Sequence, residues 1–322
     1  MDLPQSLRSA IENLVECVPH SKLVTDAQNI SMRYRTGRIN SERLITSKTE
    51  ALAYAASRMP ATYGAVYTAL ENSISVAGCF PRTIADIGAG TGAASWAASS
   101  ILDLERIVCI EKESLMLEVG KELMKHGPDP LRNAEWISGD MISAEIPKAD
   151  LVIAAYVLNE LPDAKRKEIV NKLWSASEMM LLIVEPGTPA GYKNITEARR
   201  VLVESGAHIA APCTHENTCP MEGNDWCHFT CRISRSRLHR LMKGGEAPFE
   251  DEKFSYICTV REKCSLQGMR VLRHPLVHSG FVQLEVCTQE GIRNIKLSKK
   301  DGEKYKKARK AETGTLLLAE NA

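Results

Sequence analysis

Residues Thr83-Ile-Ala-Asp-Ile-Gly-Ala-Gly-Thr-Gly92 join a short β-prone run to three closely spaced glycines. An alanine-rich helical pattern, residues 93–102, follows at once. Strand, glycine turn and helix form the opening of a nucleotide-binding βαβ unit, in which glycine lets the backbone turn sharply and approach a ligand. The run therefore predicts an α/β fold with a ligand at the end of its first strand. A glycine-rich turn in some other α/β protein is the alternative.

Strands and helices alternate through the residues that follow the glycines. The pattern predicts strands at 106–110, 135–138, 149–158 and 179–184, and helices at 93–102, 113–125 and 163–177. Regular alternation of this kind indicates a parallel, doubly wound sheet. The run 149–158 is apolar almost throughout, as a strand covered on both faces should be.

Acidic residues stand where the predicted strands end. The spacing Asp86-x-Gly88-x-Gly90-x-Gly92 resembles motif I of class I S-adenosylmethionine (SAM) methyltransferases, in which Asp86 would face the cationic amino-acid part of SAM. Glu111 follows at the spacing of roughly 20 residues at which a carboxylate meets ribose hydroxyls. In the same family an acidic residue at the position of Asp140 contacts the adenine amine. Each carboxylate alone fits a solvated strand end, but together with the glycines they favour a SAM pocket.

Composition limits the kind of protein. The chain has 322 residues and a net charge of +1, so any nucleic-acid binding must come from local basic patches. The longest apolar run, 151–158, is far shorter than a membrane span of about 20 residues. The first residues lack the pattern of a signal or transit peptide, which leads us to expect a cytoplasmic protein without membrane contact. Ten cysteines in a reducing compartment indicate metal or cluster ligands rather than disulfides.

Five regions are predicted along the chain. They are an N-terminal helical region (1–80), a SAM-binding Rossmann-like core (81–206), a cysteine-rich loop with a basic helix (207–245), the last two strands of the core sheet (246–290) and a basic C-terminal tail (291–322). The sixth strand is expected at 254–260 and the seventh at 280–287, where apolar residues alternate. The predicted fold is thus a seven-stranded, doubly wound, class I methyltransferase sheet with an insertion after the fifth strand.

The insertion is rich in cysteine. Cys213, Cys219, Cys227 and Cys231 lie within nineteen residues, among Pro, Gly, Asn and Asp that favour an irregular loop. Clustered thiols in such a loop are typical of a zinc or iron–sulfur site, although the paired C-x2-C knuckles of common zinc ribbons are absent. Unrelated cysteines in a surface loop are the alternative.

Two basic segments flank the last predicted strands. Residues 232–243 contain four arginines and one lysine with no acidic residue, and residues 293–310 contain nine basic residues against two acidic ones. Each segment could be a solvated face. Together, beside a thiol cluster, they favour an RNA-binding surface.

Several motifs together resemble one family. They are the glycine motif, Tyr156-Val-Leu-Asn-Glu-Leu161, Glu185-Pro-Gly-Thr-Pro-Ala-Gly191, Cys-x5-Cys-x7-Cys-His-Phe, Glu250-Asp-Glu-Lys-Phe-Ser-Tyr256 and the tail Lys307-Ala-Arg-Lys310. The chain looks like the methyltransferase-like family associated with the small ribosomal subunit, whose mitochondrial members act in small-subunit assembly. The resemblance implies SAM binding, contact with small-subunit ribosomal RNA, and a [4Fe–4S] cluster on Cys213, Cys219, Cys227 and Cys287. Zinc is the alternative metal. Cys231 is the alternative fourth ligand, followed by the more remote Cys258 and Cys264.

Three functions fit these features. The chain could be a SAM-dependent rRNA methyltransferase, a catalytically silent ribosome assembly factor that binds SAM and the pre-ribosomal small subunit, or a small-molecule methyltransferase with a structural zinc loop. Asn159 and Glu160 stand where amine methyltransferases carry Asn/Asp-Pro-Pro-Tyr, and either residue could orient a nucleophile or cap a helix. No catalytic base can be assigned. Off the ribosome we expect a monomer.

Overall fold

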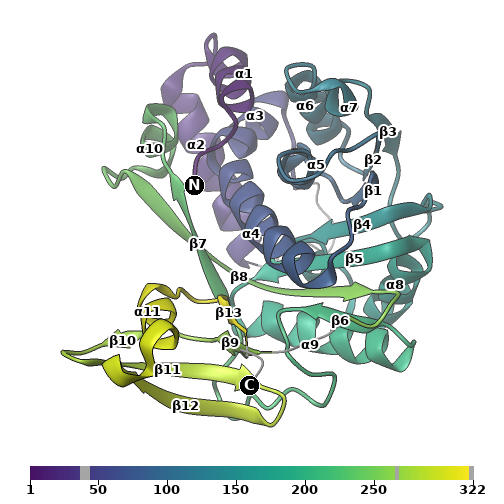
Figure 1. Ribbon diagram of the computed structural model, residues 1–322. Coiled ribbons are helices and arrows are strands. Elements are labelled where there is room, and N and C mark those ends of the chain that lie inside the picture. Colours follow the sequence, from purple (N-terminus) through teal and green to yellow (C-terminus); the bar gives the residue numbers. More distant parts are fainter. Residues whose placement is uncertain (37–43, 265–267, 319–322) are drawn as a thin grey trace.

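The computed structural model describes residues 1–36, 44–264 and 268–318. It contains a large central sheet covered by helices and a smaller second sheet near the C-terminal end (Figure 1). The helices are α1 (Gln5–Val15), α2 (His20–Thr36), α3 (Lys48–Ser57), α4 (Met59–Ala77), α5 (Ala93–Ser99), α6 (Ser114–Met124), α7 (Asp129–Arg132), α8 (Asp163–Ala176), α9 (Pro189–Glu204), α10 (Arg237–Lys243) and α11 (Gly302–Lys310). Two short 3-10 turns are η1 (Leu158–Glu160) and η2 (Lys299–Asp301).

The central sheet contains β1 (Thr83–Ile87), β2 (Arg106–Glu111), β3 (Glu135–Ser138), β4 (Ala149–Ala155), β5 (Ser177–Pro186), β6 (His208–Ala211), β7 (Phe229–Ser234) and β8 (Phe249–Val260). Its order is β3-β2-β1-β4-β5-β8-β6, with β7 paired to the first half of β8. β1 to β5 are parallel, and β8 runs antiparallel to β5 and β6. This arrangement is the class I methyltransferase sheet that the alternating pattern predicted.

Two apolar cores cover the two faces of the central sheet. Ile84 of β1 packs into the core shared with the N-terminal helices and α5, whereas Ala85 packs into the core shared with α8 and α9. β4 is buried on both faces, which explains its unbroken apolar sequence. The helices α1 to α4 lie within the predicted N-terminal helical region, and α4 packs against α5 and β8.

The second sheet corrects the predicted position of the strand at 280–287. β11 (Phe281–Thr288) pairs with β12 (Gly291–Ser298), β10 (Leu276–Val277) and β9 (Met269–Val271), and β9 also pairs with β13 (Leu316–Leu317). It is therefore not the seventh strand of the central sheet. That place belongs to β6, whose four residues directly precede the cysteine-rich loop. Alternation in 280–287 marks one buried face but cannot say which sheet the strand joins.

The basic segment after the cysteines also differs from the prediction. Residues 232–234 belong to β7, and only Arg237–Lys243 are helical, as α10. Ser236 lies between β7 and α10 and is the N-cap of α10. Its hydroxyl accepts a hydrogen bond from the His239 N–H. The predicted basic tail forms β12, η2, α11 and the short strand β13, and its described part ends at residue 318.

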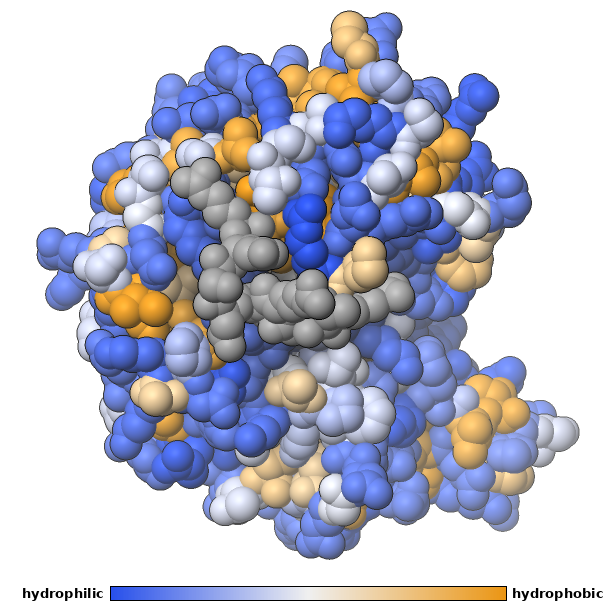
Figure 2. Space-filling model, turned by 180° about the vertical axis from the view of Figure 1, so that it is seen from behind, coloured by the Kyte–Doolittle hydropathy of each residue, from blue (hydrophilic) through white to orange (hydrophobic). Residues whose placement is uncertain are grey.

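The surface seen from behind is largely hydrophilic (Figure 2). The second sheet projects from the body as a separate lobe and carries an apolar patch. Leu276 and Val277 of β10 are among the exposed large apolar side chains of the molecule. Within the described ranges, no helix has the length and apolar character needed to span a bilayer.

Candidate functional site

The glycine turn connects β1 to α5 at the carboxyl end of the parallel strands. Gly88 and Gly92 both have positive φ, at 68° and 86°. A Cβ on Gly88 would come within 2.3 Å of Val157 Cγ1, and one on Gly92 within 2.5 Å of Met124 Cε. Glycine is therefore required at both positions for backbone conformation and for space. The turn packs directly against the segment that follows β4.

Glu111 supports this turn from the end of β2. Its Oε2 accepts a hydrogen bond from the Gly90 N–H at 2.7 Å, and its Oε1 accepts one from the Glu113 N–H at 2.8 Å. Burial raises the pKa of Glu111 to about 7, against the lowering effect of these two bonds. The structure thus brings Glu111 to the glycine turn, as the sequence predicted.

Asp86 and Asp140 occupy different surroundings. Asp86 is 1% exposed, and its Oδ2 accepts hydrogen bonds from the Ser95 N–H and hydroxyl at 3.0 and 2.7 Å. Burial raises the pKa of Asp86 to about 6. Its carboxylate therefore anchors the start of α5 and does not face an open pocket. Asp140 is exposed after β3 and accepts a bond from the Ile142 N–H.

A buried carboxylate that the sequence interpretation missed holds the segment after β4. Glu185, at the end of β5, is fully buried and accepts a hydrogen bond from the Leu158 N–H at 2.9 Å. The Asn194 amide donates to Asn159 Oδ1 at 2.7 Å and lies 3.4 Å from Glu185 Oε2. Asn159 is thereby fixed two residues after Val157, which packs against Gly88 of the glycine turn. An acidic residue closing an apolar strand was the available signal for Glu185.

Glu185 should make folding stability depend on pH. Burial raises its pKa from 4.5 to about 8, so the folded protein holds this proton at pH values where the unfolded chain has lost it. Stability should therefore fall as the pH rises from about 4.5 to about 8. Glu185→Gln keeps an oxygen acceptor for Leu158 and removes the ionisation, so its thermal midpoint should vary less over the same pH range. Equal pH profiles for the variant and the parent protein would contradict this prediction.

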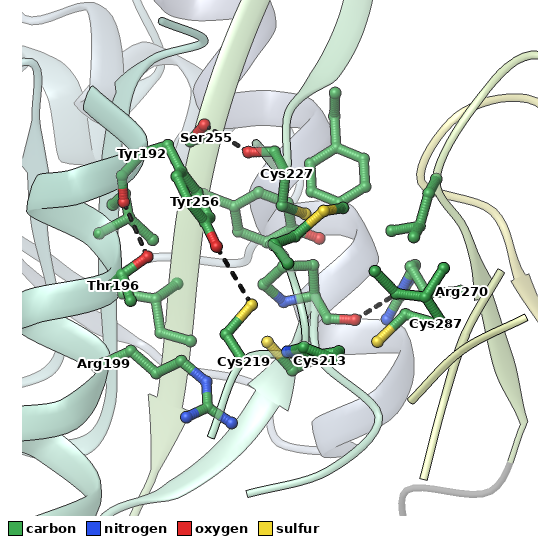
Figure 3. Close-up of a pocket in the computed structure, with 18 of the residues that line it drawn as sticks. Tyr192, Thr196, Arg199, Cys213, Cys219, Cys227, Ser255, Tyr256, Arg270 and Cys287 are labelled. Atoms are coloured by element: carbon green, nitrogen blue, oxygen red, sulfur yellow. Dashed lines mark hydrogen bonds between the residues drawn. The ribbon is translucent and has the colours of Figure 1, made fainter. Parts of the chain in front are cut away.

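The four cysteines predicted to bind a cluster line a single cavity (Figure 3). Cys213, Cys219 and Cys227 come from the irregular loop between β6 and β7, whereas Cys287 comes from β11 of the second sheet. The cavity therefore lies where the central sheet, the cysteine-rich loop and the second sheet meet. The Thr214 hydroxyl donates to the Cys287 carbonyl at 3.2 Å, which helps to hold the loop against β11.

The thiols in the cavity interact electrostatically. Burial raises the pKa of Cys287 to about 11, and the neighbouring Cys213 and Cys219 act in the same direction. Burial and the other three thiols also raise the pKa of Cys227 well above its usual range. Near neutral pH Cys227 and Cys287 are therefore neutral thiols in the absence of a bound cation. A metal would have to displace their protons, as it does in other thiolate sites.

Three other cysteines lie away from this cavity. Cys231 is buried on β7 near Gly64 of α4, and the charge of Glu252 contributes to its raised pKa. Cys258 is buried in β8, and Cys264 hydrogen-bonds to the Ile209 carbonyl. The structure thus brings Cys287, and not Cys231, to the other three cysteines. In the part of the chain that the structure describes, no three His, Cys, Asp or Glu side chains are arranged to hold a single metal ion.

The two basic segments differ in how far acidic residues neutralise them. Arg232 pairs with Asp251 at 2.7 Å, while Arg235 and Lys243 both pair with Glu250, at 3.1 and 3.0 Å. Arg235 and Glu250 are largely buried, so this part of the segment is structural. In the second segment Lys306 pairs with Glu303 at 2.5 Å. The basic residues of η2 and α11 are nevertheless all exposed; they are Lys299, Lys300, Lys304, Lys306, Lys307, Arg309 and Lys310.

The strand order of the central sheet and the glycine turn after β1 define a protein with the class I methyltransferase fold. Its sequence matches the family described as mitochondrial small ribosomal subunit Rsm22 over residues 48–317, and the chain belongs to this family. Human "Ribosome assembly protein METTL17, mitochondrial" is 28% identical over 260 residues, covering 74% of this chain and 56% of the relative. "Rsm22-cox11 tandem protein 2, mitochondrial" of Schizosaccharomyces pombe is 26% identical over 326 residues, covering 84% and 43%.

The chain thus spans about half the length of these curated relatives. Among solved structures, magnesium protoporphyrin IX methyltransferase from Synechocystis PCC 6803 with bound SAM aligns at a TM-score of 0.42 and 14% identity, over 76% of this chain and 99% of that one.

The cytoplasmic location predicted from the sequence is contradicted by these comparisons. The family and the curated relatives are all described as mitochondrial. The earlier expectation depended on the first residues of a chain that matches only part of its relatives. Those residues are therefore a poor guide to location.

Proposed function

We propose that this chain is a SAM-binding, [4Fe–4S]-containing protein that binds small-subunit ribosomal RNA during assembly of the small ribosomal subunit. The observation that carries the proposal is the cavity in which Cys213, Cys219, Cys227 and Cys287 meet. Three of these thiols come from one loop and the fourth from a separate sheet. Membership of the Rsm22 family and the names of the curated relatives support the ribosomal part of the proposal.

The cavity fits an iron–sulfur cluster by the chemistry of its donors. Four thiols are the usual ligand set of a [4Fe–4S] cluster, and no acidic side chain is present among the residues that line this cavity. The cluster would join the cysteine-rich loop to the second sheet and so fix the basic residues of α11 relative to the central sheet. Zinc remains the alternative, because four thiolates suit it as well.

SAM is proposed to bind over the glycine turn. Gly88, Gly90 and Gly92 would let its amino-acid part approach the backbone, while Glu111 would accept from the ribose and the exposed Asp140 from the adenine amine. SAM would supply an electrophilic methyl group. The protein would align a nucleophile with that group, and proximity and orientation can provide much of the rate enhancement in such a reaction.

Two readings of the activity remain within this proposal. In one, Asn159 orients an acceptor nucleotide for methylation. Asn194 holds the Asn159 side chain, and Glu185 holds the neighbouring Leu158 N–H. In the other, the same residues are structural and the protein is an assembly factor without methyl transfer. Cross-linking in the native cell, followed by sequencing of the bound RNA, tests both. Small-subunit RNA should be recovered, and an altered methylation at the contacted site in a deletion strain would favour the enzyme. Recovery of unrelated RNA would contradict the proposal.

RNA binding should depend on the exposed lysines of η2 and α11. Lys300→Glu with Lys304→Glu should weaken binding to many RNA sequences alike, because contacts to phosphate position a protein without specifying sequence. The parent protein should show a log–log salt slope of roughly −0.7 per neutralised phosphate on single strands, and the double variant a shallower one. Filter binding across a salt series measures both quantities.

Lys167→Glu is the matched control for that experiment. Lys167 is exposed on α8, which covers the central sheet away from the second sheet. This change should leave RNA affinity and its salt slope nearly unchanged. Arg235 is unsuitable as a probe, because its pairing with Glu250 would link loss of RNA binding to loss of folding. An affinity that stays constant from low to high salt would exclude the proposed electrostatic surface.

A further inference from the structure

Four polar groups in the cysteine cavity have no hydrogen-bond partner among the described residues: His215 Nδ1 and three donor groups. The donor groups are Arg199 Nε, Arg270 Nη2 and the Tyr256 hydroxyl. All three side chains are almost completely buried, with 6%, 1% and 1% of their surface exposed. Buried donors normally find an acceptor, because an unpaired donor loses its hydration without compensation. Their presence together in one cavity therefore indicates that the cavity holds an acceptor.

The two arginines are fixed on their other sides by backbone carbonyls, three from the loop that carries the cysteines and one from Gly314. Arg199 Nη2 donates to the carbonyls of His215 and Asn217, at 2.9 and 2.6 Å. Arg270 donates from Nε to the Pro212 carbonyl at 2.9 Å and from Nη1 to the Gly314 carbonyl at 2.8 Å. Neither guanidinium can turn away without breaking these bonds. Each one keeps an unused N–H in a preorganised position.

The charges in the cavity match this arrangement. Two guanidinium groups line it, and its described lining contains no carboxylate. An oxidised [4Fe–4S] cluster with four thiolate ligands carries a net charge of about −2, and its sulfur atoms accept hydrogen bonds. A buried anion of this size needs both charge compensation and donors.

We infer that Tyr256, Arg199 and Arg270 donate hydrogen bonds to the sulfur atoms of a cluster held by the four cysteines, and that the two arginines compensate its charge. This inference rests on the proposed function. It assigns to these residues a positioning and tuning role and not a ligand role. Donors to cluster sulfurs stabilise the more negative, reduced state most, so they raise the reduction potential.

Tyr256→Phe is the most specific test because it removes only the hydroxyl. When purified anaerobically, the variant should keep its iron and sulfide but have a lower midpoint potential. Electron paramagnetic resonance spectra recorded during a titration with dithionite measure this potential. It should also release iron to a chelator faster. In cluster-free protein the thermal midpoint should not fall, because the hydroxyl has no partner there. The substitution thus acts in the loaded protein without harming the empty one.

Tyr305→Phe is the matched control. Tyr305 on α11 is also buried, and its hydroxyl also lacks a partner among the described residues, but it does not line the cavity. Its removal should leave the midpoint potential and the rate of iron release unchanged. Arg199→Gln should lower the potential further than Tyr256→Phe, since it removes a charge, and Arg199→Lys should restore part of the loss.

The outcomes separate this inference from the proposed cluster. If the parent protein and Tyr256→Phe both contain the cluster and have the same midpoint potential, the inference is overturned and the proposed cluster is not. An equal shift in the Tyr305→Phe control would overturn it as well. Anaerobic protein that contains zinc or no metal would instead overturn the proposed cluster, and the inference with it.

Discussion

Cys287→Ser should abolish the iron–sulfur cluster, whereas Cys231→Ser should leave it in place. Anaerobically purified parent protein should be brown and contain about four irons and four sulfides per chain. Cys287 lines the cavity shared with Cys213, Cys219 and Cys227, and serine is a much weaker ligand for iron. Cys231 lies against α4, outside that cavity. Iron and sulfide analysis with visible absorption spectra measures the difference.

The two variants are well matched. Both cysteines are buried on a strand, and each substitution replaces one sulfur atom by oxygen. Loss of RNA binding should accompany loss of the cluster in Cys287→Ser. SAM affinity should be retained, since the glycine turn between β1 and α5 contributes no residue to the cysteine cavity. A bleached Cys231→Ser protein beside a brown Cys287→Ser protein would move the fourth ligand to Cys231. If the parent protein is colourless and contains one zinc, the cavity holds a single zinc ion and the proposed cluster is wrong.

SAM affinity should fall by about ten- to a hundredfold in Glu111→Ala. A hydrogen bond to a charged group contributes roughly 1.5–3 kcal/mol, and each factor of ten in affinity corresponds to about 1.4 kcal/mol. Glu111 also holds the Gly90 N–H at 2.7 Å, so the variant loses both the ribose acceptor and the support of the turn. Gly90→Leu should have a similar effect, because the side chain would enter space that the turn leaves open next to Met116 and because Gly90 has a φ of 56°, which strains any other residue. Calorimetric titration with SAM gives the affinities.

Glu135→Ala is the control for the SAM titration. Glu135 begins β3 and pairs with Arg106 at the opposite end of the parallel strands, where its side chain is exposed. Removing it should leave SAM affinity unchanged. Melting curves of each variant would exclude general unfolding as the cause of any loss. Full affinity in both Glu111→Ala and Gly90→Leu would exclude the pocket over the glycine turn.

The parallel part of the fold could be predicted from the sequence because its signals are local. Each signal occupies a few adjacent residues. These signals are the glycines at the end of β1, the apolar runs in β4 and β5, and the helical periodicity of the segments between strands. β6 has only four residues and no alternation that separates it from the loop, so the sequence did not reveal it. β11 was visible as a strand, but its pairing with β12 depends on a turn at Gly291 and on a second apolar core.

The candidate site divides in the same way. The cysteines of the loop lie close together in sequence, and the family resemblance supplied Cys287. Cys231 and Ile233 alternate on β7 as buried residues, and this pattern was the available sign that Cys231 points to α4. The contacts of Glu185, Arg199 and Tyr256 join segments that are distant along the chain. Such contacts follow from tertiary packing and have no counterpart in local sequence pattern.

The order of the chain separates the completion of the central sheet from the completion of the cysteine cavity. The last strand of the central sheet, β8, ends at Val260, and Cys287 is synthesised only afterwards. Domains fold largely as units from the N-terminal end as the chain emerges from the ribosome. The central sheet with its glycine turn can therefore form before the fourth thiol exists, when Cys213, Cys219 and Cys227 are already part of the chain. Insertion of a cluster would then be a late step of maturation, and a shortage of iron or sulfide would leave a folded but unfinished protein.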